Sequence, residues 1–466
     1  MTIEAIQQAF LRQSEDGRPI YRRLAEAIAQ QIESGQLAAS SKLPTHRALA
    51  DRLGVTVGTI TRAYAETERR GLVEARVGAG TYVCAHNRPG WVFSYPNQTP
   101  DECNFGYNIP PAIDRAPILA SAIQTLSQHP DLLNHLMLYQ DPQGLTAHRE
   151  AISRWLRTHG VQLDPARMHF TSGAQHAIQL VLSVFCRSGD TLLTEQVAYP
   201  GFLGLARQMQ MTIKGVEMDA EGLLPDSLET ACRQYQPRML YCTPTLQNPT
   251  AATMSRERRE AILAICRRHQ VLIIEDDVNG LLPAKTPPPL VNLDSEQVIH
   301  FGSLSKCLAP GLRLGYIQVP VKHQNRLNTA LHHHCLMISP LLSALVCELI
   351  HQGDADRVLQ QIREDMQLRA KRLENYLGQY QVQYQSPGFH AWLALPDHWR
   401  LSDFVAAAEA RGVVVKSAEL FTPPGSTIYQ AVRLAISAPH SHDKLEQGLA
   451  ILAELLAQAP YPDFPL

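Results

Sequence analysis

The chain has 466 residues, more than a single hydrophobic core comfortably supports, so two or more domains are expected. Its 45% hydrophobic and 18% charged residues exclude a fibrous or largely disordered protein. The formal net charge is only −2, and residues 1–84, with 11 Lys and Arg against 9 Asp and Glu, reach only +2. Charge alone therefore does not indicate nucleic-acid binding, so such a function has to rest on pattern.

Three features bear on the compartment. The opening MTIEAIQQAF has no basic start before an apolar run and resembles a short amphipathic segment rather than a signal peptide. No apolar stretch is long enough for a membrane span. The nine cysteines are scattered and never spaced as CxxC, which is typical of reduced thiols. We therefore expect a cytoplasmic protein with no membrane partner and no bound metal, and we place His332–His334 on a helix surface.

The N-terminal residues 1–84 predict a winged helix-turn-helix. Apolar spacing, caps and turn residues indicate three helices followed by a two-stranded hairpin, at 19–35, 45–54, 55–71 and 72–83. Thr56 is the expected N-cap of the third helix, while Gly35 and Gly71 are expected to end the first and third helices.

A linker is predicted over residues 85–112, because this stretch has five prolines and no periodic apolar pattern. A random coil of that length spans about 30 Å, and proline extends it further. The linker is therefore long enough to separate two domains or to reach a partner subunit.

Residues 113–466 predict an α/β domain. Short β-rich runs such as VLIIED (271–276), VIHFGS (298–303) and LGYIQV (314–319) alternate with helical stretches, which is the rhythm of a parallel sheet covered by helices. Further short strands after long helical segments indicate a smaller C-terminal lobe over approximately 345–466.

The run FGSLSKCLAPGLRLGY carries the most chemistry. Lys306 follows a strand end, with Ser303 and Ser305 before it and Arg313 on a Gly-Pro frame after it. Hydroxyls and a guanidinium suit a phosphate, and a neighbouring lysine amine suits an aldehyde. Pyridoxal phosphate (PLP) needs this set, although a lysine at a strand end is more often a solvated surface residue.

Two further segments fit this cofactor. Asp276, at the end of VLIIED, is placed to keep a pyridine nitrogen protonated, or alternatively to cap the next helix. The stretch TSGAQHAIQLV (171–181) turns from small residues into a helix, whose N-terminal N–H groups and dipole suit an anion. By itself this second segment is only a good helix start.

Taken together, these motifs resemble known families. Residues 113–466, with SLSK, PGLRLG, TPTLQNPT and IIEDD in this order, resemble a fold-type I, aspartate-aminotransferase-like PLP domain. The N-terminal pattern resembles the winged helix of GntR regulators, and the fusion in this order resembles their MocR subfamily. The expected fold is thus multidomain: a winged helix-turn-helix plus an α/β aminotransferase-like domain with a small C-terminal lobe.

The resemblance implies roles for individual residues. Lys306 would form the internal aldimine, Asp276 would pair with the pyridine nitrogen, and Arg433 would receive an effector carboxylate. Asn248 would bond the phenolic oxygen and Tyr199 would stack on the ring. The remaining cofactor contacts would come from Tyr139 of a neighbouring subunit, the loop residues Gly173, Ala174 and Gln175, and Ser303, Ser305 and Arg313. The alternative explanation for Tyr199 is core packing, and the alternative for Arg433 is a surface ion pair.

The chain departs from the family pattern at two places. A tyrosine that bonds the phenolic oxygen is replaced in DDVNG by Val278, which leaves Asn279 as the candidate. A second carboxylate-binding arginine, found in some members, is Gly201 here. This glycine argues against an effector with a second acidic group.

The resemblance also implies a mode of DNA binding, with the third helix in the major groove and the second helix and wing on the backbone. The candidate contacts are Thr45, Arg47, Thr56, Thr59, Arg62, Gly78 and Gly80. Arg47 matches a phosphate-contacting arginine of GntR proteins, or is an ordinary surface residue. Val57 and Gly58 stand where other members have a base-reading arginine, so threonines, the wing and DNA shape are expected to matter.

Two functions remain open. The first is a PLP-dependent regulator that binds double-stranded operator DNA as a domain-swapped homodimer and senses an amino acid, an amine or vitamin B6. The second is a working aminotransferase with an accessory DNA-binding domain. The winged helix and the linker favour the regulator.

Overall fold

The computed structural model describes residues 2–11, 19–33, 36–38, 41–69, 72–76, 80–83 and 102–458. The chain forms two compact units, Met1–Tyr95 and Pro96–Leu466. Each unit is described by itself below.

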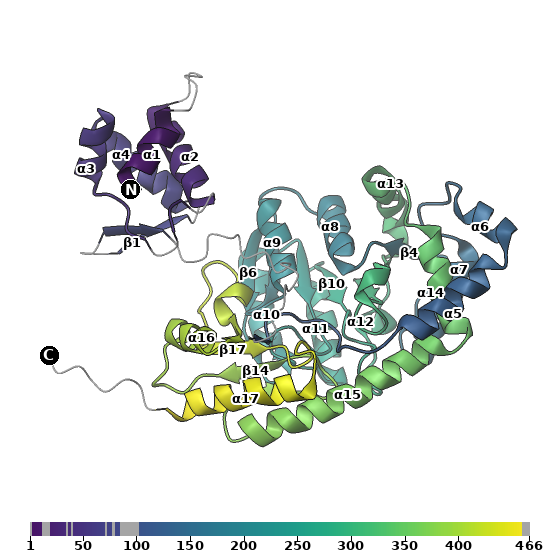
Figure 1. Cartoon of the computed structure of the whole chain (residues 1–466). Helices are drawn as coiled ribbons and strands as arrows, with labels where there is room; N and C mark the ends of the chain where they lie inside the picture. Colours follow the sequence, from purple (N-terminus) through teal and green to yellow (C-terminus); the bar gives the residue numbers. More distant parts are fainter. Residues whose placement is uncertain are drawn as a thin grey trace. The chain divides into compact units, whose positions relative to one another are not determined.

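The first unit contains the expected helices and hairpin, preceded by one more helix (Figure 1). Its elements are α1 Thr2–Leu11, α2 Ile20–Glu33, α3 His46–Leu53, α4 Val57–Arg69 and the antiparallel strands β1 Val73–Arg76 and β2 Gly80–Val83. The amphipathic opening segment is α1, and it buries Ile6 against α2 and α3. Thr56 accepts a hydrogen bond from the amide of Thr59, as expected of an N-cap. Gly35 and Gly71 lie outside the described residues.

The second unit is built on a seven-stranded sheet in the order β4-β12-β11-β10-β9-β5-β6. The strands are β4 Met168–Thr171, β5 Thr191–Glu195, β6 Thr212–Val216, β9 Met239–Cys242, β10 Leu272–Asp276, β11 Val298–Ser303 and β12 Gly315–Gln318. Neighbouring residues along a strand face opposite layers, so Leu192 and Ile274 join one core cluster, and Leu193 and Ile273 the other. The sheet is therefore buried on both faces.

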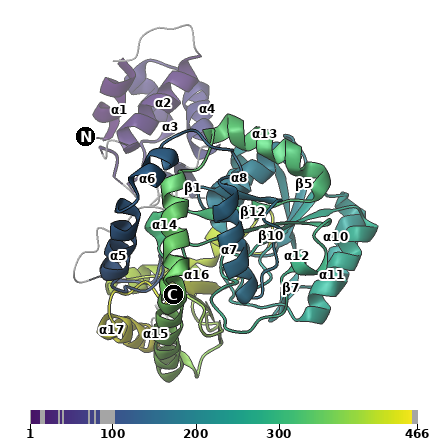
Figure 2. The same ribbon diagram turned by 90° about the vertical axis from the view of Figure 1, so that its right-hand side faces the viewer.

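Helices cover both faces of this sheet. One layer consists of α8 Ala174–Phe185, α9 Pro200–Gln208 and α13 Gln324–Cys335. The other layer consists of α7 Thr146–Thr158, α10 Pro225–Tyr235, α11 Arg256–Arg268 and α12 Leu290–Leu293. Figure 2 shows α5 Ala116–Ser127 beside α14 Pro340–His351, near the short α6 Pro130–Leu136. Strands β7 Met218–Asp219 and β8 Gly222–Leu223 form a small hairpin.

The sheet is mixed, because one of its strands departs from the parallel arrangement that the sequence pattern indicates. Strand β12 runs antiparallel to both of its neighbours, β11 and β4. Only residues 304–314 connect β11 to β12, which is too short a connection for the helical crossover that parallel neighbours need. The candidate lysine loop occupies this connection.

The C-terminal lobe has an antiparallel four-stranded sheet in the order β13-β14-β17-β16. Its strands are β13 Val382–Tyr384, β14 Ala391–Ala394, β16 Lys416–Ser417 and β17 Ala431–Leu434. The long helix α15 Asp354–Leu377 runs beside α17 His442–Ala457 (Figure 1), and α16 Leu401–Ala410 packs on α17. Short 3₁₀ turns lie at Pro310–Leu312, Val321–His323 and Ala418–Phe421.

The prediction of a linker over residues 85–112 is wrong for its last part, where residues 103–105 belong to the second unit. Strand β3 Cys103–Asn104 pairs in parallel with β15 Val413–Val414, and Phe105 is buried against Gly448 of α17. This pairing partner lies some three hundred positions away in the chain, so no local pattern indicates it. Residues 85–101 of the region lie outside the described part of the chain.

Within the described ranges, no single helix is long and apolar enough to cross a membrane. The pair Val321–Cys335 and Pro340–His351, bent by 115°, passes on length and composition only when taken together. In the same ranges, no group of three or more His, Cys, Asp or Glu side chains is arranged to hold a metal ion. His332–His334 are exposed near the end of α13.

Candidate cofactor and effector site

The candidate residues of the second unit gather where the parallel strands end. Asp276 is the last residue of β10, Ser303 is the last of β11, and Lys306 follows in the loop to β12. Ligands of open α/β sheets bind at the carboxyl ends of the strands. The strand order therefore brings together residues that are far apart in the sequence.

Lys306 lies in a turn, and its side-chain amine points into the protein. Its Nζ donates a hydrogen bond to the backbone carbonyl of Asn108. Burial, together with the charge of Arg433 and against the opposing charge of Asp276, lowers the pKa of Lys306 to about 8. A lysine with this pKa supplies far more neutral amine near neutral pH than a solvated lysine does.

Asp276 is 5% exposed and has two hydrogen-bond donors. The hydroxyl of Tyr241 donates to Oδ2 at 2.6 Å, and the amide of Val278 donates to Oδ1 at 3.2 Å. Burial raises the pKa of Asp276 to about 6, although the Tyr241 hydroxyl favours the charged form. Tyr241 is held flat against Phe202 of α9, with ring centroids 3.9 Å apart. The carboxylate is thus oriented by a packed tyrosine.

The neighbouring carboxylate, not Asp276, caps the next helix. Glu275 accepts hydrogen bonds from the amides of Leu290 and Val291 at the start of α12, at 2.6 and 3.0 Å, and also contacts His300 Nδ1 at 2.9 Å. Because successive residues of a strand face opposite layers, Glu275 and Asp276 belong to different layers. The helix-capping alternative therefore falls on Glu275.

A second group of residues forms an anion-binding cradle. Gly173 caps α8 with φ +79°, and a Cβ there would lie 2.8 Å from Nη2 of Arg313. Arg313 in turn donates to the carbonyl of Ser172 at 3.0 Å, and the hydroxyls of Ser303 and Ser305 are 3.0 Å apart. The first N–H groups of α8, at Ala174 and Gln175, have no acceptor within the helix. The backbone can approach Arg313 this closely only because residue 173 is glycine.

Tyr199 and Gly201 explain one departure from the family pattern. Tyr199 precedes α9, and burial raises the pKa of its hydroxyl. A Cβ at Gly201 would lie 2.4 Å from the Tyr199 ring and 2.6 Å from Oε1 of Gln175. The tyrosine ring and the glutamine amide therefore leave no room for a side chain at position 201.

The guanidinium group of Arg433 is buried in the C-terminal lobe. It stands in β17, is 4% exposed, and donates to the carbonyl of Gly106 and to Oδ1 of Asn248 at 3.2 Å. Its Cζ lies 5.2 Å from the centroid of the Phe421 ring. Among the described residues, no carboxylate pairs with it and its Nε has no partner. The surface ion-pair alternative does not describe this side chain.

Two predicted residues have other surroundings. Asn279 is buried and donates from Nδ2 to the carbonyl of Leu246 at 2.9 Å, which leaves its Oδ1 without a partner. Tyr139 is 82% exposed and, within the described part of the chain, has no hydrogen bond to the side chains above. Met137 and Leu138, immediately before it, are also exposed, by 64% and 60%.

Sequence reasoning missed several polar groups of this region. Tyr241 lies in a strand that the β-rich pattern indicates, but only the sheet register shows it beside Asp276. Burial lowers the pKa of His390 to about 3; its Nε2 donates to the Gln247 carbonyl, and its Nδ1 has no partner among the described residues. Lys416 lies opposite Arg433 in the register of β16 and β17. No sequence motif marks any of the three.

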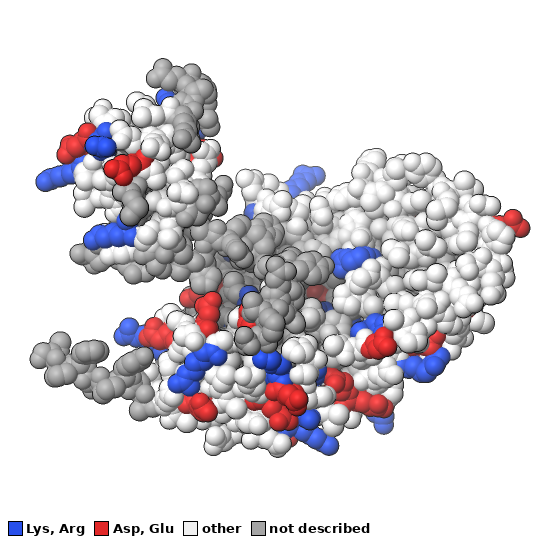
Figure 3. Space-filling view, viewed as in Figure 1, with Lys and Arg blue, Asp and Glu red and all other residues white. Residues whose placement is uncertain are grey.

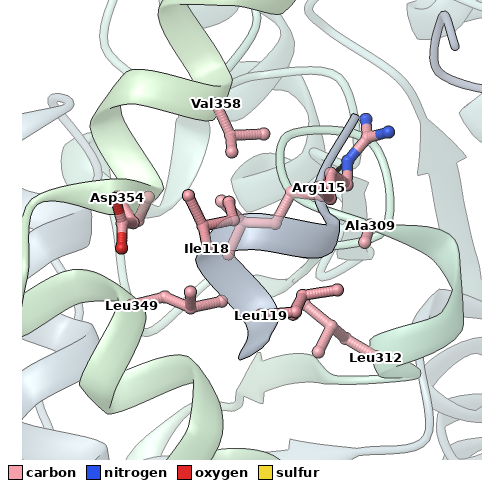
Figure 4. Close-up of a pocket in the computed structure, with 10 residues that line it drawn as sticks. Arg115, Ile118, Leu119, Ala309, Leu312, Leu349, Asp354 and Val358 are labelled. Atoms are coloured by element: carbon pink, nitrogen blue, oxygen red, sulfur yellow. Dashed lines mark hydrogen bonds between the residues drawn. The ribbon is translucent and has the colours of Figure 1, made fainter. Parts of the chain in front are cut away.

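A small cavity lies behind the lysine loop (Figure 4). Aliphatic side chains from α5, α14 and α15, including Leu119, Leu349 and Val358, point toward one another around it. Its volume of about 10 Å³ is close to the least that holds one water molecule. At its edge, Arg115 donates from Nε to the carbonyl of Leu308 at 2.6 Å. The cavity is thus a small packing defect beside the loop.

The candidate DNA contacts of the first unit lie mostly on its surface. Arg47 follows the start of α3, and Arg62 lies on α4; both are exposed. Thr45 caps α3 by accepting from Ala48 at 3.3 Å, and the hydroxyls of Thr56 and Thr59 are 3.0 Å apart. Gly80 begins the second wing strand, whereas Gly78 lies outside the described residues.

Comparison with known proteins agrees with both units. A family model for aminotransferase class I and II matches residues 100–452, and a model for bacterial regulatory proteins of the gntR family matches residues 20–83. The chain is 31% identical over 439 residues to the uncharacterized HTH-type transcriptional regulator YdeF of Bacillus subtilis, covering 94% of this chain and 95% of the relative. It is 29% identical over 399 residues to the vitamin B6 salvage pathway transcriptional repressor PtsJ of Salmonella typhimurium, covering 85% and 90%.

Among solved structures, an archaeal alanine:glyoxylate aminotransferase matches with a TM-score of 0.68 and 26% identity, over 76% of this chain and 90% of that chain. Members of the aminotransferase class I and II family bind PLP. The side chains described above fit that group: an inward-facing amine of lowered pKa, a buried carboxylate, a glycine cradle beside an arginine, and a buried guanidinium without a carboxylate.

Proposed function

We propose that this chain binds operator DNA as a homodimer and responds to an amino-acid, amine or vitamin B6-type effector at Lys306 and Arg433. The premise is that the chain belongs to the MocR subfamily of GntR transcriptional regulators. PLP, when bound, supplies an aldehyde that takes a primary amine and a ring that withdraws electrons. The protein's part is to hold, orient and sense these groups.

The cofactor would be held from three sides. Asp276, oriented by Tyr241, would hold the proton on the pyridine nitrogen. The phosphate would lie in the cradle of Gly173, Ala174, Gln175, Ser303, Ser305 and Arg313. Tyr199 would lie on the ring, and Asn248 would donate to the phenolic oxygen, with Asn279 as a second polar group. Lys306 would supply the amine that attaches the cofactor.

A regulatory role is supported by the contacts of backbone residues 106–108, which come just after the stretch that joins the two units. The Gly106 carbonyl accepts from Arg433, and the Asn108 carbonyl accepts from Lys306. A carboxylate at Arg433 or an aldehyde at Lys306 competes directly with these carbonyls. Occupancy of the site and the position of residues 106–108 are therefore thermodynamically linked.

This segment is also the start of the path toward the winged helix. Strand β3 ties residues 103–104 to β15, and the residues before it lead back to the first unit. Residues 106–108 follow β3 almost directly, so an effector that displaces them would act first on this strand.

Dimerisation is supported by an apolar surface on the second unit. Met137, Leu138 and Tyr139 are exposed after α6, Leu336 is exposed at the end of α13, and Leu341 is exposed in the first turn of α14. The amide of Gln140 meets Sδ of Met337 at 3.1 Å, so the two groups are neighbours. In Figure 3 the region over α13 and α6 has few charged side chains. Large exposed apolar patches commonly mark interfaces, and Tyr139 would reach the partner's phosphate site from here.

Anisotropy titrations of operator DNA, identified by genomic mapping with and without PLP, test this proposal. Wild type should change its DNA affinity on loading with PLP and effector, whereas Lys306→Ala and Arg433→Gln should not respond. Arg411→Gln, an exposed arginine of the same lobe, is the control. An unchanged affinity of the wild type in every loading state would contradict the proposal. Rapid multiple-turnover transamination would instead favour the aminotransferase alternative.

A further inference from the structure

Two cationic side chains stand directly opposite each other in the C-terminal lobe. Strands β16 and β17 are antiparallel, and their register pairs Lys416 with Arg433. Directly opposite residues of an antiparallel pair project from the same side of the sheet, and like charges in this arrangement are destabilising. The pair therefore calls for an anion that compensates it.

The ends of both side chains lie beside the same backbone segment, Gly106 and Tyr107. Arg433 donates to the carbonyl of Gly106, and a Cβ built on Gly106 would lie only 3.0 Å from Cε of Lys416. The Nζ of Lys416 lies 5.9 Å from the centroid of the Tyr107 ring. The ammonium and the guanidinium thus flank the segment that also contacts Lys306 through Asn108.

Among the residues that the structure describes, no carboxylate forms an ion pair with these two cations. Within the described ranges, neither Lys416 nor Arg433 forms an ion pair, and Nε of Arg433 is buried without a partner. Glu409 favours the charge of Lys416 but is exposed and forms no hydrogen bond with it. Burial and the charge of Arg433 lower the pKa of Lys416. Lys306 adds a third cation, and the charge that opposes it is the carboxylate of Asp276.

We propose that Lys416 is a second anion-binding group beside Arg433, and that the effector is a short amino acid with an acidic side chain, such as a dicarboxylic amino acid. Arg433 would take the α-carboxylate and Lys416 the second acidic group. This inference rests on the proposed function, because it names the ligand class of that same site. It differs from the expectation drawn from Gly201, since the second cation would come from another strand.

The simpler interpretation is that Lys416 only packs on Tyr107. Methionine keeps most of the aliphatic length of lysine and removes its charge, so Lys416→Met separates charge from packing. Lys416→Arg restores the charge. Lys371→Met removes a lysine at an exposed position of α15 instead.

Calorimetry on the full-length PLP-loaded protein, with aspartate and glutamate against asparagine and glutamine, tests the proposal. Wild type should bind the acidic amino acids about tenfold or more tightly than their amides, as expected of one charge-assisted hydrogen bond. Lys416→Met should abolish this preference, Lys416→Arg should restore most of it, and Lys371→Met should keep it. Each variant should retain PLP, read from the absorbance of the attached cofactor.

Three results would overturn the inference. Equal affinity of wild type for the acidic amino acids and their amides would remove the second anion site while leaving the proposed function intact. Loss of PLP in Lys416→Met would assign the lysine to the cofactor instead. If wild type bound none of the four amino acids, both the inference and the amino-acid form of the proposed function would be wrong.

Discussion

The hydroxyl of Tyr241 lies 2.6 Å from Oδ2 of Asp276, and both side chains are buried on the α8–α9 side of the sheet. Burial raises the pKa of Asp276 to about 6, while the tyrosine hydroxyl lowers it. Tyr241 therefore helps Asp276 to remain ionised at neutral pH, where an ionised carboxylate is needed to pair with a protonated pyridine nitrogen.

Tyr241→Phe should raise the pKa of Asp276 and weaken PLP binding at pH 7 by roughly three- to tenfold, as loss of one buried hydrogen bond suggests. The deficit should shrink at pH 8.5, where Asp276 ionises in both proteins. Absorbance titrations with PLP at the two pH values measure it. Tyr316→Phe is the matched control, because it removes a buried hydroxyl that has no partner in the described structure. Identical PLP affinity of wild type and Tyr241→Phe at pH 7 would remove this role.

Asp276 should also make the stability of the PLP-free protein depend on pH. Its pKa of about 6 in the folded state exceeds the ordinary value of 3.8, so the folded state binds more protons between these values. The free energy of unfolding should therefore fall as pH rises from about 4 to 6, by on the order of 2 kcal/mol from this residue. Urea titrations of wild type and Asp276→Asn measure the difference, which should disappear below pH 4. A difference that does not vary with pH would refute it.

Lys306 should attach PLP with a pH midpoint near 8, its pKa, rather than near 10.5, because the neutral amine is the attacking form. Removing the like charge in Arg433→Gln should move this midpoint to higher pH. Attachment rates followed by absorbance give the midpoint, and Arg411→Gln should leave it unchanged. Lys306→Ala should lose the borohydride-reducible attachment altogether; a reducible adduct that persisted would show that another residue holds the cofactor.

Arg47→Ala and Arg62→Ala should weaken operator binding. If each arginine neutralises a phosphate, the slope of log affinity against log salt should become less negative by about one for each variant. Anisotropy titrations between 50 and 200 mM salt are a suitable range for this slope. Arg154→Ala, at an exposed position of α7 in the other unit, serves as the control. Unchanged affinity and slope in both variants would exclude the proposed docking.

Leu138→Asp should dissociate the proposed homodimer, because it places a charge within the apolar surface after α6. Sedimentation equilibrium should show a rise in the monomer fraction, with a parallel loss of PLP if the partner's Tyr139 contributes to the phosphate site. Leu368→Asp, on the exposed side of α15, should leave the assembly unchanged. A monomeric wild type would contradict this prediction at once.

Local patterns in the sequence were sufficient for much of the first unit. The helices, the Thr56 cap and the wing strands depend on contacts between residues that are close in the chain, and the structure confirms their order. The α/β fold with its small lobe was also predictable, because alternating strand and helix patterns are local.

Other features depend on partners that are distant in the chain. Strand β12 is antiparallel because its connection is short, and residues 103–105 belong to the second unit because β15 pairs with them. Neither periodicity nor composition records such pairings.

The sequence by itself determined the chemical groups of the site: the lysine, the carboxylate, the serines and arginine around a phosphate, and Arg433. Only the tertiary structure decided which group assists which. The register of the sheet puts Tyr241 beside Asp276. Because side chains alternate along a strand, Glu275 rather than Asp276 caps the next helix. The pairing of β16 with β17 puts Lys416 opposite Arg433. The reason is physical: reactivity is set by side-chain type, whereas pKa, orientation and charge compensation are set by neighbours that only the fold brings together.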